Sequence, residues 1–531
     1  MNKKLHVLLL VFIGFTLYLN SLTNGFVGDD FQQIVNNSKI TSVKNIPTFF
    51  LGSTYQSGGN RLKGLYYRPI MLSVFSFINQ IFGSDALFFH LIQIILHIAN
   101  ALLIYYLLNN FFKRFASFLI STIFLVHPLN NEAVVYIANL QEELFFFFGM
   151  LALLLLLKRK INYIAFFIFS LLSLFSKESG ILFLIASNAY SYLFKQKQAR
   201  KVLLITVVAL LIYLFFRYPI AKMHLAQGSV GPVYQAALLG RLMNIPAILF
   251  YYLQRFFFPL QISSHHFWII TSFNLNDFFL PLIFLVFFFT ILIIGIKSVS
   301  LKKKDNAKIY TFFLIWILAG LSLHLQILPL DATVADRWFY FPMTGILALI
   351  ALLVSDVDYL LNFFKKHRLP SYLILTTIIL LLFIRTWLRN FDWKNDLTLY
   401  SHDIKYTKKN FVLDNSLGAA LISLGHYREA KPYILSSIKS YRYYANLNNL
   451  AIIYTHEKNY KQAKEYLNLA IKDSNNEQAY ENYANFLLHY DDIKEAEAFT
   501  KKALIIFPKD ANLWLTLKKI ENQIEKTNEK L

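Results

Sequence analysis

Two adjacent carboxylates near the N-terminus have the residue type and position for acid–base chemistry. Asp29 and Asp30 end the string Gly25-Phe26-Val27-Gly28-Asp29-Asp30, which follows a long apolar segment. Neighbouring carboxylates repel one another, and desolvation raises the pKa of a carboxyl group, which is how a general base is produced. A solvated acidic pair at a membrane surface would have the same sequence, so the dipeptide alone leaves both interpretations open.

Three basic residues that are far apart in the sequence could bind an anion together. Arg68 precedes Pro69, Lys177 precedes Glu178, and Arg337 follows Asp336. Guanidinium and ammonium groups donate charge-assisted hydrogen bonds to phosphate oxygens. Each residue taken singly is more often a helix cap or a solvated loop residue, so only their convergence would indicate a site.

Further polar residues interrupt apolar segments and are additional site candidates. They are His90, His97, His127, Glu132, Glu142, Glu143, Glu178 and Asp336. His90 and His97 are two helical turns apart and therefore share a helix face. Nothing beside them completes a carboxylate-flanked metal set, so we interpret both as core hydrogen-bonding residues and predict no metal.

The composition indicates the environment in which these residues lie. Of 531 residues, 56% are apolar and 16% are charged, which excludes an ordinary soluble multidomain protein. The formal net charge of +21 fits basic cytoplasmic loops of a membrane protein, and no nucleic-acid partner is expected. The absence of Cys excludes disulfides, thiolate nucleophiles and Cys-ligated zinc.

Apolar runs long enough to approach a membrane span recur over the first two thirds of the chain. We expect eleven spans, near residues 5–23, 86–108, 115–127, 139–157, 161–176, 180–194, 202–217, 279–296, 310–329, 338–354 and 371–388. The first lacks a clear cleavage site and is interpreted as an uncleaved span. Residues 70–82 and 238–258 are apolar but interrupted, so the bundle has about 11 to 13 spans.

Clusters of Lys and Arg orient these spans. Eleven spans alternate so that six clusters are cytoplasmic: Lys3-Lys4, Lys113-Arg114, 158–160, 195–201, 297–308 and 365–368. The same alternation places outside the cytoplasm the segments 24–85, 127–141, 177–179 and 330–337, and everything after Arg389. The acids and cations named above are thereby predicted to gather on one side of the membrane.

The last third of the chain contains a repeat with a period of 33 residues. Small residues recur in register at Ala430, Ala463 and Ala496, at Ser437, Ala470 and Ala503, and at Gly418, Ala451 and Ala484. Small side chains at fixed positions let paired helices approach closely, which favours a tetratricopeptide α-solenoid of three repeats with a terminal helix, 511–526. A generic amphipathic helical bundle is the alternative. The predicted domains are 1–388 in the membrane, a linker 389–410 and a repeat domain 411–531.

Several strings together carry a resemblance to a known family. In order they are Gly25 to Asp30, Tyr67-Arg68-Pro69, His90-Leu91, Leu96-His97, His127-Pro128, Asn131-Glu132-Ala133-Val134, Ser176 to Gly180, Ala335 to Pro342, Arg385-Thr386, Arg389-Asn390 and Asp392-Trp393. This series resembles the transmembrane and tetratricopeptide repeat-containing proteins, which are related to protein O-mannosyltransferases of the C-type glycosyltransferase superfamily. The family usually has Glu where this chain has Asp336, and its repeat array is often longer.

The resemblance implies an all-α protein, a polytopic C-type glycosyltransferase-like bundle followed by the solenoid. It implies inverting transfer of mannose or another hexose from a polyprenyl-phosphate donor to an extracytoplasmic acceptor, with protein Ser or Thr hydroxyls as the expected acceptor groups. Asp29 and Asp30 would supply the base, with their individual roles unassigned, and Arg68, Lys177 and Arg337 would bind the lipid phosphate. The expected partners are membrane lipid, the donor and an acceptor protein bound through the repeats. No cofactor is predicted, and no motif requires a divalent metal.

Two other functions remain open at this point. A non-catalytic scaffold would use its repeats to bind partner proteins, and a flippase or polymerase would act on the same lipid-linked sugars. A scaffold would not turn over the donor, whereas a transporter would move the lipid without breaking the bond between sugar and phosphate. Abundant Lys, Asn, Ile and Phe are typical of an AT-rich bacterial genome, so we expect the bacterial cytoplasmic (inner) membrane.

The predicted orientation can be tested with a topology reporter. The basic cluster 365–368 should hold the start of the last span in the cytoplasm, which places the repeats outside. A protein that fluoresces only in the cytoplasm, fused after Leu531, should therefore stay dark. A bright fusion would overturn the span count and the common face that depends on it.

Overall fold

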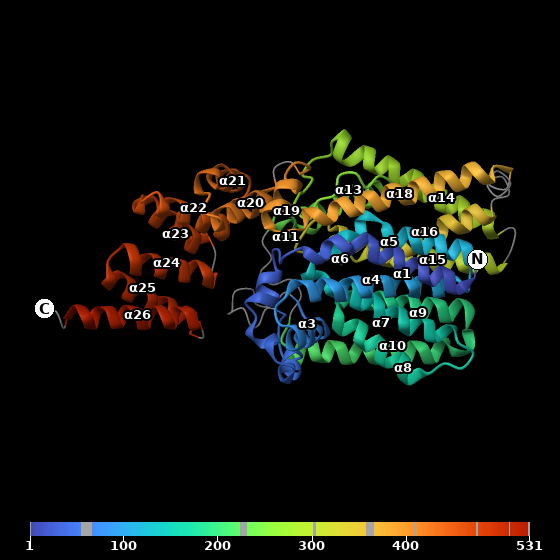
Figure 1. The fold of residues 1–531 in the computed structure, drawn as a ribbon, viewed down its shortest axis with the longest axis horizontal. Coiled ribbons are helices and arrows are strands. Elements are labelled where there is room, and N and C mark those ends of the chain that lie inside the picture. The colour runs from blue at the N-terminus through green and yellow to red at the C-terminus, as the bar shows by residue number, and fades with distance from the viewer. Residues whose placement is uncertain are drawn as a thin grey trace. The chain divides into compact units, whose positions relative to one another are not determined.

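The protein is all-α in the part of the chain that is described. A computed structural model describes residues 2–54, 66–223, 231–300, 304–356, 366–407, 410–473, 476–508 and 510–528, and within these ranges the regular elements are helices, without strands (Figure 1). Residues 55–65 of the predicted outer loop, and Lys365, lie outside the described residues. The chain divides into two compact units between Asn395 and Asp396, inside the predicted linker.

The first unit is a bundle of helices that run side by side (Figure 1). Its helices are α1 (Lys3–Tyr18), α2 (Ile46–Phe49), α3 (Pro69–Phe82), α4 (Ala86–Leu108), α5 (Arg114–Val126), α6 (Asn131–Val135), α7 (Leu140–Leu157), α8 (Tyr163–Ser176), α9 (Ile181–Phe194), α10 (Gln196–Phe215), α11 (Pro232–Gln235), α12 (Leu238–Leu242), α13 (Ile245–Phe257), α14 (Leu280–Ser300), α15 (Lys304–Ser322), α16 (Tyr340–Asp356) and α18 (Arg368–Asp392). All eleven apolar ranges predicted from the sequence overlap helices of this unit, although the range 310–329 extends beyond α15, which ends at Ser322.

Seven of these helical segments are long and apolar enough to cross a membrane. An eighth candidate is α5 together with the turn and α6, which bend by 53° at the break after Val126. The helices α5, α8 and α9 have 13, 14 and 14 residues, too few to cross a ~30 Å hydrocarbon core alone. The predicted total of about 11 to 13 spans stays a prediction, whereas the membrane bundle itself is confirmed.

The outer surface of this bundle suits lipid. On α14 the side chains of Ile283, Phe287 and Ile294 are exposed, and on α18 those of Leu373 and Leu381 are exposed. Such apolar side chains would be unfavourable in water but are compatible with acyl chains. This lipid-compatible surface explains much of the apolar excess in the composition.

A turn between α8 and α9 packs unusually tightly. Glu178–Gly180 form one 3₁₀ turn, and a Cβ atom added to Gly180 would lie 2.6 Å from the backbone carbon of Ser173. Only glycine permits this approach, since the atoms it meets are backbone atoms that cannot rotate away. The close approach fixes the position of Lys177 and Glu178 against the end of α8.

The second unit consists of helix pairs that follow the predicted repeat. After α19 (Asp396–Asp403) come α20 (Phe411–Ser423), α21 (Tyr427–Ser440), α22 (Tyr444–His456), α23 (Tyr460–Asp473), α24 (Glu477–Tyr490), α25 (Ile493–Ile506) and α26 (Ala511–Asn528). Ala430, Ala463 and Ala496 are fully buried at the predicted contacts between paired helices. The solenoid of three pairs and a terminal helix is therefore as predicted.

The turn at Gly180 provides a test of this packing. Gly180→Ala should destabilise the protein by about 1–3 kcal/mol, because the added methyl group overlaps backbone atoms of α8. Gly240→Ala is the matched control, since its added methyl would contact only the Ala236 side chain at 3.8 Å. Thermal unfolding in detergent should give a lower midpoint for the first variant and not for the second. Equal midpoints would contradict the tight turn.

Candidate active site

The two aspartates of the predicted acid pair lie in different environments. Asp30 is fully buried, and its carboxylate accepts hydrogen bonds from the backbone N–H groups of Val27 (3.0 Å) and Ala138 (2.6 Å). Asp29 is exposed, and its backbone N–H donates to the Tyr136 hydroxyl at 2.8 Å. Gly28 adopts a positive φ of 51°, which lets the chain turn between the two anchors.

Residues 24–30, which carry Asp29 and Asp30 and which we call the acid loop, are attached to the end of α18. The Asn24 side chain donates to the backbone carbonyl of Asn390 at 2.9 Å, and the Gly25 N–H donates to the carbonyl of Lys394 at 3.0 Å. The ring of Trp393 stacks on Tyr136 with centroids 5.4 Å apart. The late string Asn390 to Lys394 therefore holds the acid loop in place.

Arg337 binds Glu132 through two groups. Its guanidinium forms an ion pair with one carboxylate oxygen of Glu132, and its backbone N–H donates to the other at 2.9 Å. Glu132 is buried, and the Arg337 side chain is 18% exposed, so part of the guanidinium stays accessible to a ligand. Charge-assisted, two-point contacts of this kind fix the orientation of an arginine.

Lys177 and Arg337 share a second buried carboxylate. The Lys177 ammonium lies 2.5 Å from Oε1 of Glu142, and Nε of Arg337 lies 4.0 Å from the same oxygen. Burial lowers the pKa of Lys177, while the charge of Glu142 opposes that shift. Two cations that are 160 residues apart in the sequence thus lie beside one carboxylate, which agrees with the expectation that these basic residues come together in the fold.

Two further cations, Arg68 and Arg217, lie around a third glutamate, Glu178. The Arg68 guanidinium stacks on the ring of Tyr66, 4.1 Å from its centroid, and the Tyr66 hydroxyl donates to Asp331. Arg217 lies 3.8 Å from Glu178. Burial alone would raise the pKa of Glu178, but the charges of Arg68 and Arg217 hold it below its usual value.

We call these residues the cation cluster: Arg68, Lys177, Arg217 and Arg337, with the glutamates Glu132, Glu142 and Glu178. Asp331, which accepts a hydrogen bond from Tyr66, is a fourth carboxylate at the edge of the cluster, so cations and carboxylates are equal in number. Nε of Arg68 and Nε of Arg217 are buried donors without a partner among the described residues. Unpaired buried donors of positive charge favour binding of an anion.

Segment 131–143 connects the cation cluster with the acid loop. It carries Glu132 and Glu142, which bind the cations, and its Ala138 N–H binds Asp30. Tyr136 of the same segment binds Asp29. This short, largely buried segment therefore fixes the position of the acid loop relative to the cation cluster.

Two of the three histidine candidates, His97 and His127, make hydrogen bonds inside the bundle. His97 accepts from the Tyr340 hydroxyl at 2.8 Å and donates to the Leu125 carbonyl at 3.1 Å. His127 donates to the Phe256 carbonyl at 3.0 Å and caps the turn that follows. His90 is buried in α4, and neither of its ring nitrogens has a hydrogen-bond partner among the described residues, so its predicted role as a core hydrogen-bonding residue stays a prediction. In the described part of the chain, no group of three or more His, Asp or Glu residues could hold a metal.

Two acidic candidates lie apart from the ion pairs of the cluster. Asp336 is buried and accepts from the Tyr251 hydroxyl at 2.6 Å, which in turn contacts His266 at 2.8 Å. Glu143 is fully buried near Tyr340, and neither carboxylate oxygen has a partner among the described residues.

Sequence reasoning missed Arg217 and Asp331 as members of the site. Arg217 is the last residue of the predicted span 202–217, and Asp331 lies in the predicted outer segment 330–337. The signal for Arg217 was its position as a basic residue at the outer end of its predicted span, level with Lys177.

The proteins that this chain resembles in sequence are named protein O-mannosyl-transferases. The chain is 25% identical over 446 residues to "Protein O-mannosyl-transferase F38B6.6" of Caenorhabditis elegans, covering 82% of this chain and 62% of that protein. It is 22% identical over 470 residues to "Protein O-mannosyl-transferase TMTC3" of Homo sapiens, covering 81% and 51%. A shorter match of 143 residues to "Protein O-mannosyl-transferase TMTC1" of Mus musculus is 31% identical, covering 26% and 15%.

The chain thus spans between half and two thirds of the length of the curated relatives that it matches over most of its own length. No protein-family model and no solved structure matches it. The resemblance inferred from the motifs is confirmed: this chain is a homologue of the transmembrane and tetratricopeptide repeat-containing proteins that are named protein O-mannosyl-transferases.

Proposed function

We propose that this protein is an integral membrane glycosyltransferase that transfers mannose or another hexose from a polyprenyl monophosphate to a hydroxyl group of a protein on the extracytoplasmic side. The observation that carries the proposal is the convergence of Arg68, Lys177 and Arg337 in one cluster beside the acid loop. The names of the homologues agree with this activity.

The unpaired donors of the cation cluster favour a donor substrate with a single phosphate. Four cations face three glutamates and Asp331, so the capacity of the cluster for an anion rests on its buried unpaired donors and not on an excess of positive charge. These donors are the Nε–H groups of Arg68 and Arg217. Two such donors suit the oxygens of one phosphate group, so the donor that we propose is a sugar joined to a lipid by a single phosphate.

Apolar residues beside the cluster can receive the lipid of such a donor. Tyr67, Phe175 and Tyr213 belong to a buried aromatic group with Phe50 and Phe216 packed against it. Tyr67 precedes Arg68, and Tyr213 accepts a hydrogen bond from Arg217 at 2.6 Å. The first isoprene units could pack against the partly exposed rings of Phe50 and Phe216 while the phosphate contacts the guanidinium groups.

The roles of the two aspartates follow from their burial. Asp29 is the exposed carboxylate and would accept the proton of the acceptor hydroxyl, while Asp30 holds the loop through two backbone hydrogen bonds. The acceptor oxygen then forms a bond to the anomeric carbon. The bond from that carbon to the phosphate oxygen breaks, and the lipid phosphate leaves with the electron pair, stabilised by the cations.

Substitution of the acid pair tests this division of roles. Asp29→Asn should lower the rate of transfer from polyprenyl-phosphate mannose to a Ser/Thr peptide by about 10²–10⁴-fold without changing thermal unfolding, because Asn cannot accept the proton. Asp30→Asn should lower the unfolding midpoint, because a neutral amide accepts the Ala138 hydrogen bond less strongly than a carboxylate. Near wild-type turnover of Asp29→Asn would exclude Asp29 as the base.

Arg68 is the best cation to substitute in a test of the phosphate site. Lys177, Arg217 and Arg337 each form an ion pair with a glutamate, whereas Arg68 forms none among the described residues. Arg68→Ala should weaken binding of a polyprenyl phosphate by about 10–100-fold, and Arg68→Lys should recover part of it, because the planar fork becomes a point charge. Arg159→Ala, in a predicted cytoplasmic loop, is the control and should bind normally. Binding to detergent-solubilised protein that is the same in all three variants would contradict the donor site and favour the scaffold function.

A further inference from the structure

A second group of polar side chains lies around the buried carboxylate of Asp336. This carboxylate accepts a hydrogen bond from the Tyr251 hydroxyl at 2.6 Å, and the hydroxyl lies 2.8 Å from Nε2 of His266. The same nitrogen donates to the backbone carbonyl of Ser263 at 2.8 Å. The guanidinium of Arg255, one turn after Tyr251 on α13, lies 5.4 Å from the centroid of the tyrosine ring. We call Arg255, Ser263 and Asp336 the Asp336 group.

Each member of the Asp336 group has a buried polar atom without a partner. Oδ2 of Asp336, Nε of Arg255 and Oγ of Ser263 make no hydrogen bond to any described residue. Asp336 and Ser263 are each 1% exposed. The three atoms are an acceptor, a donor and a hydroxyl that can do both. Unsatisfied atoms of this kind cost free energy, which a ligand with matching groups would recover.

The carboxylate and the guanidinium of this group are neighbours but do not pair. The charge of Arg255 acts on Asp336, yet the two side chains form no ion pair in the described part of the chain. A hydroxyl placed between them can accept from the guanidinium and donate to the carboxylate at the same time. The arrangement therefore suits a ligand that carries hydroxyl groups.

The mixture of charges in the Asp336 group selects an uncharged ligand. The carboxylate of Asp336 would repel a phosphate, and the guanidinium of Arg255 would repel a cation. An apolar ligand would leave all three polar atoms unsatisfied. A molecule with several hydroxyl groups can satisfy each of them, and a hexose is such a molecule.

The Asp336 group adjoins the proposed phosphate site. Asp336 and Arg337 are consecutive residues, and the charge of Glu132, which holds Arg337, also acts on Asp336. The charge of Arg389, next to the residue that holds the acid loop, acts on Asp336 as well. In a lipid-phosphate sugar the hexose is bonded directly to the phosphate, so a phosphate at Arg337 places the sugar close to these side chains.

We infer that Arg255, Ser263 and Asp336 bind the hydroxyl groups of the donor's hexose. The inference rests on the proposed function, because it takes the phosphate of the same molecule to lie at Arg337. The side chains of Arg255 and Arg337 are both partly exposed, which leaves one side of each accessible to the donor. Sugar recognition is thereby assigned to α13, to the segment after it and to the turn before α16.

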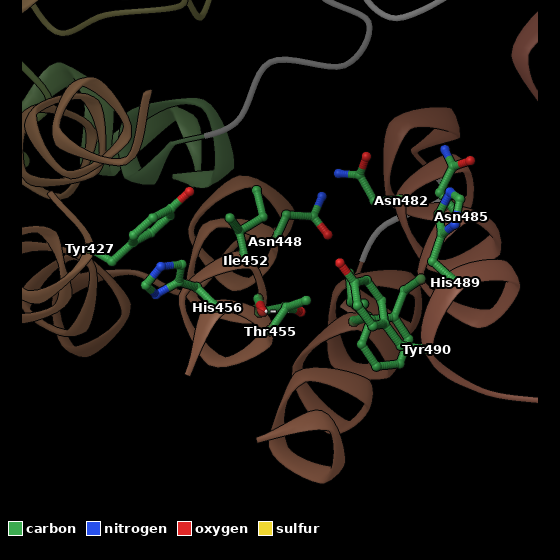
Figure 2. A pocket seen from close by; sticks show the side chains of 12 residues that line it. Tyr427, Asn448, Ile452, Thr455, His456, Asn482, Asn485, His489 and Tyr490 are labelled. Atoms are coloured by element: carbon green, nitrogen blue, oxygen red, sulfur yellow. Dashed lines mark hydrogen bonds between the residues drawn. The ribbon is translucent and has the colours of Figure 1, made fainter. Parts of the chain in front are cut away.

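A pocket in the second unit is the rival site for a hexose. It has a volume of about 360 Å³ and lies between α22 and α24, where the amides of Asn448 and Asn482 are directed toward one another (Figure 2). None of the residues that line it carries a permanent charge. Hydrogen bonds from sugar hydroxyls to neutral amides are weaker than those to a carboxylate or a guanidinium, which favours the Asp336 group.

A comparison of two lipids, with the full-length protein in detergent, tests the inference. The probes are polyprenyl-phosphate mannose and bare polyprenyl phosphate, and the wild type should bind the mannose-bearing lipid more tightly. Asp336→Asn should weaken binding of that lipid by about 10–100-fold, and Ser263→Ala by about threefold to tenfold, without weakening binding of the bare phosphate. Asp305→Asn is the matched control, since Asp305 is exposed on α15, and it should bind both lipids normally.

Each outcome decides between the hexose site and its alternatives. Ser263→Ala should keep the unfolding midpoint, because its Oγ has no partner, and a lower midpoint would indicate a structural residue and overturn the inference. An equal loss of both lipids in Asp336→Asn would also overturn it, as would loss of the preference for mannose in Asn448→Ala with Asn482→Ala.

The wild type separates this inference from the proposed function. Equal affinity for the two lipids would show that water and not a sugar satisfies the Asp336 group, which would overturn the inference and leave the proposed phosphate site standing. Binding of neither lipid would refute the proposed function, and the inference with it.

Discussion

The first unit depends on the compensation of buried cations by buried carboxylates. Glu142 lies against Lys177 and within reach of Arg337, and Glu132 holds Arg337 through both its guanidinium and its backbone. A cation removed from water without such partners would cost several kcal/mol, and removing one partner of a pair leaves the other unpaired. The ion pairs therefore determine how α7, the turn after α8 and the turn before α16 meet, because Glu142, Lys177 and Arg337 lie on these three segments.

The same constraint explains why segment 131–143 is broken into short helices. A continuous helix would direct its side chains around one axis, whereas the observed turns direct Glu132 and Glu142 toward the cations and the Ala138 N–H toward Asp30. The bend after Val126 has a role in this arrangement, since His127 caps the turn and anchors it to Phe256. Buried irregular backbone is stable only when its polar groups are satisfied in this way.

Periodicity predicted the helices and the solenoid, because apolar runs and small residues at a spacing of 33 report local geometry directly. The convergence of Arg68, Lys177 and Arg337 was predicted from topology alone, since loops on one side of a bundle meet. The different burial of Asp29 and Asp30 could not be predicted, because it depends on the N–H group of Ala138, a hydrogen bond across 108 residues. Arg217 was missed for a similar reason: its partner Glu178 is adjacent in space and not in sequence.

The solenoid repeats one contact at each junction. Tyr427 at the start of α21 stacks on the end of α22, and Tyr460 at the start of α23 stacks on the end of α24. Each helix pair therefore gains its stability from its immediate neighbours, as in a one-dimensional chain of coupled units. Such an array responds to damage by fraying: loss of α26 would uncover Leu504 and its neighbours on α25 and weaken the last pair first, while α20 and α21 would remain folded. Cooperative folding of this unit thus depends on contacts between neighbouring helix pairs. The loss of stability caused by a defect therefore becomes smaller with each repeat that separates a helix pair from it.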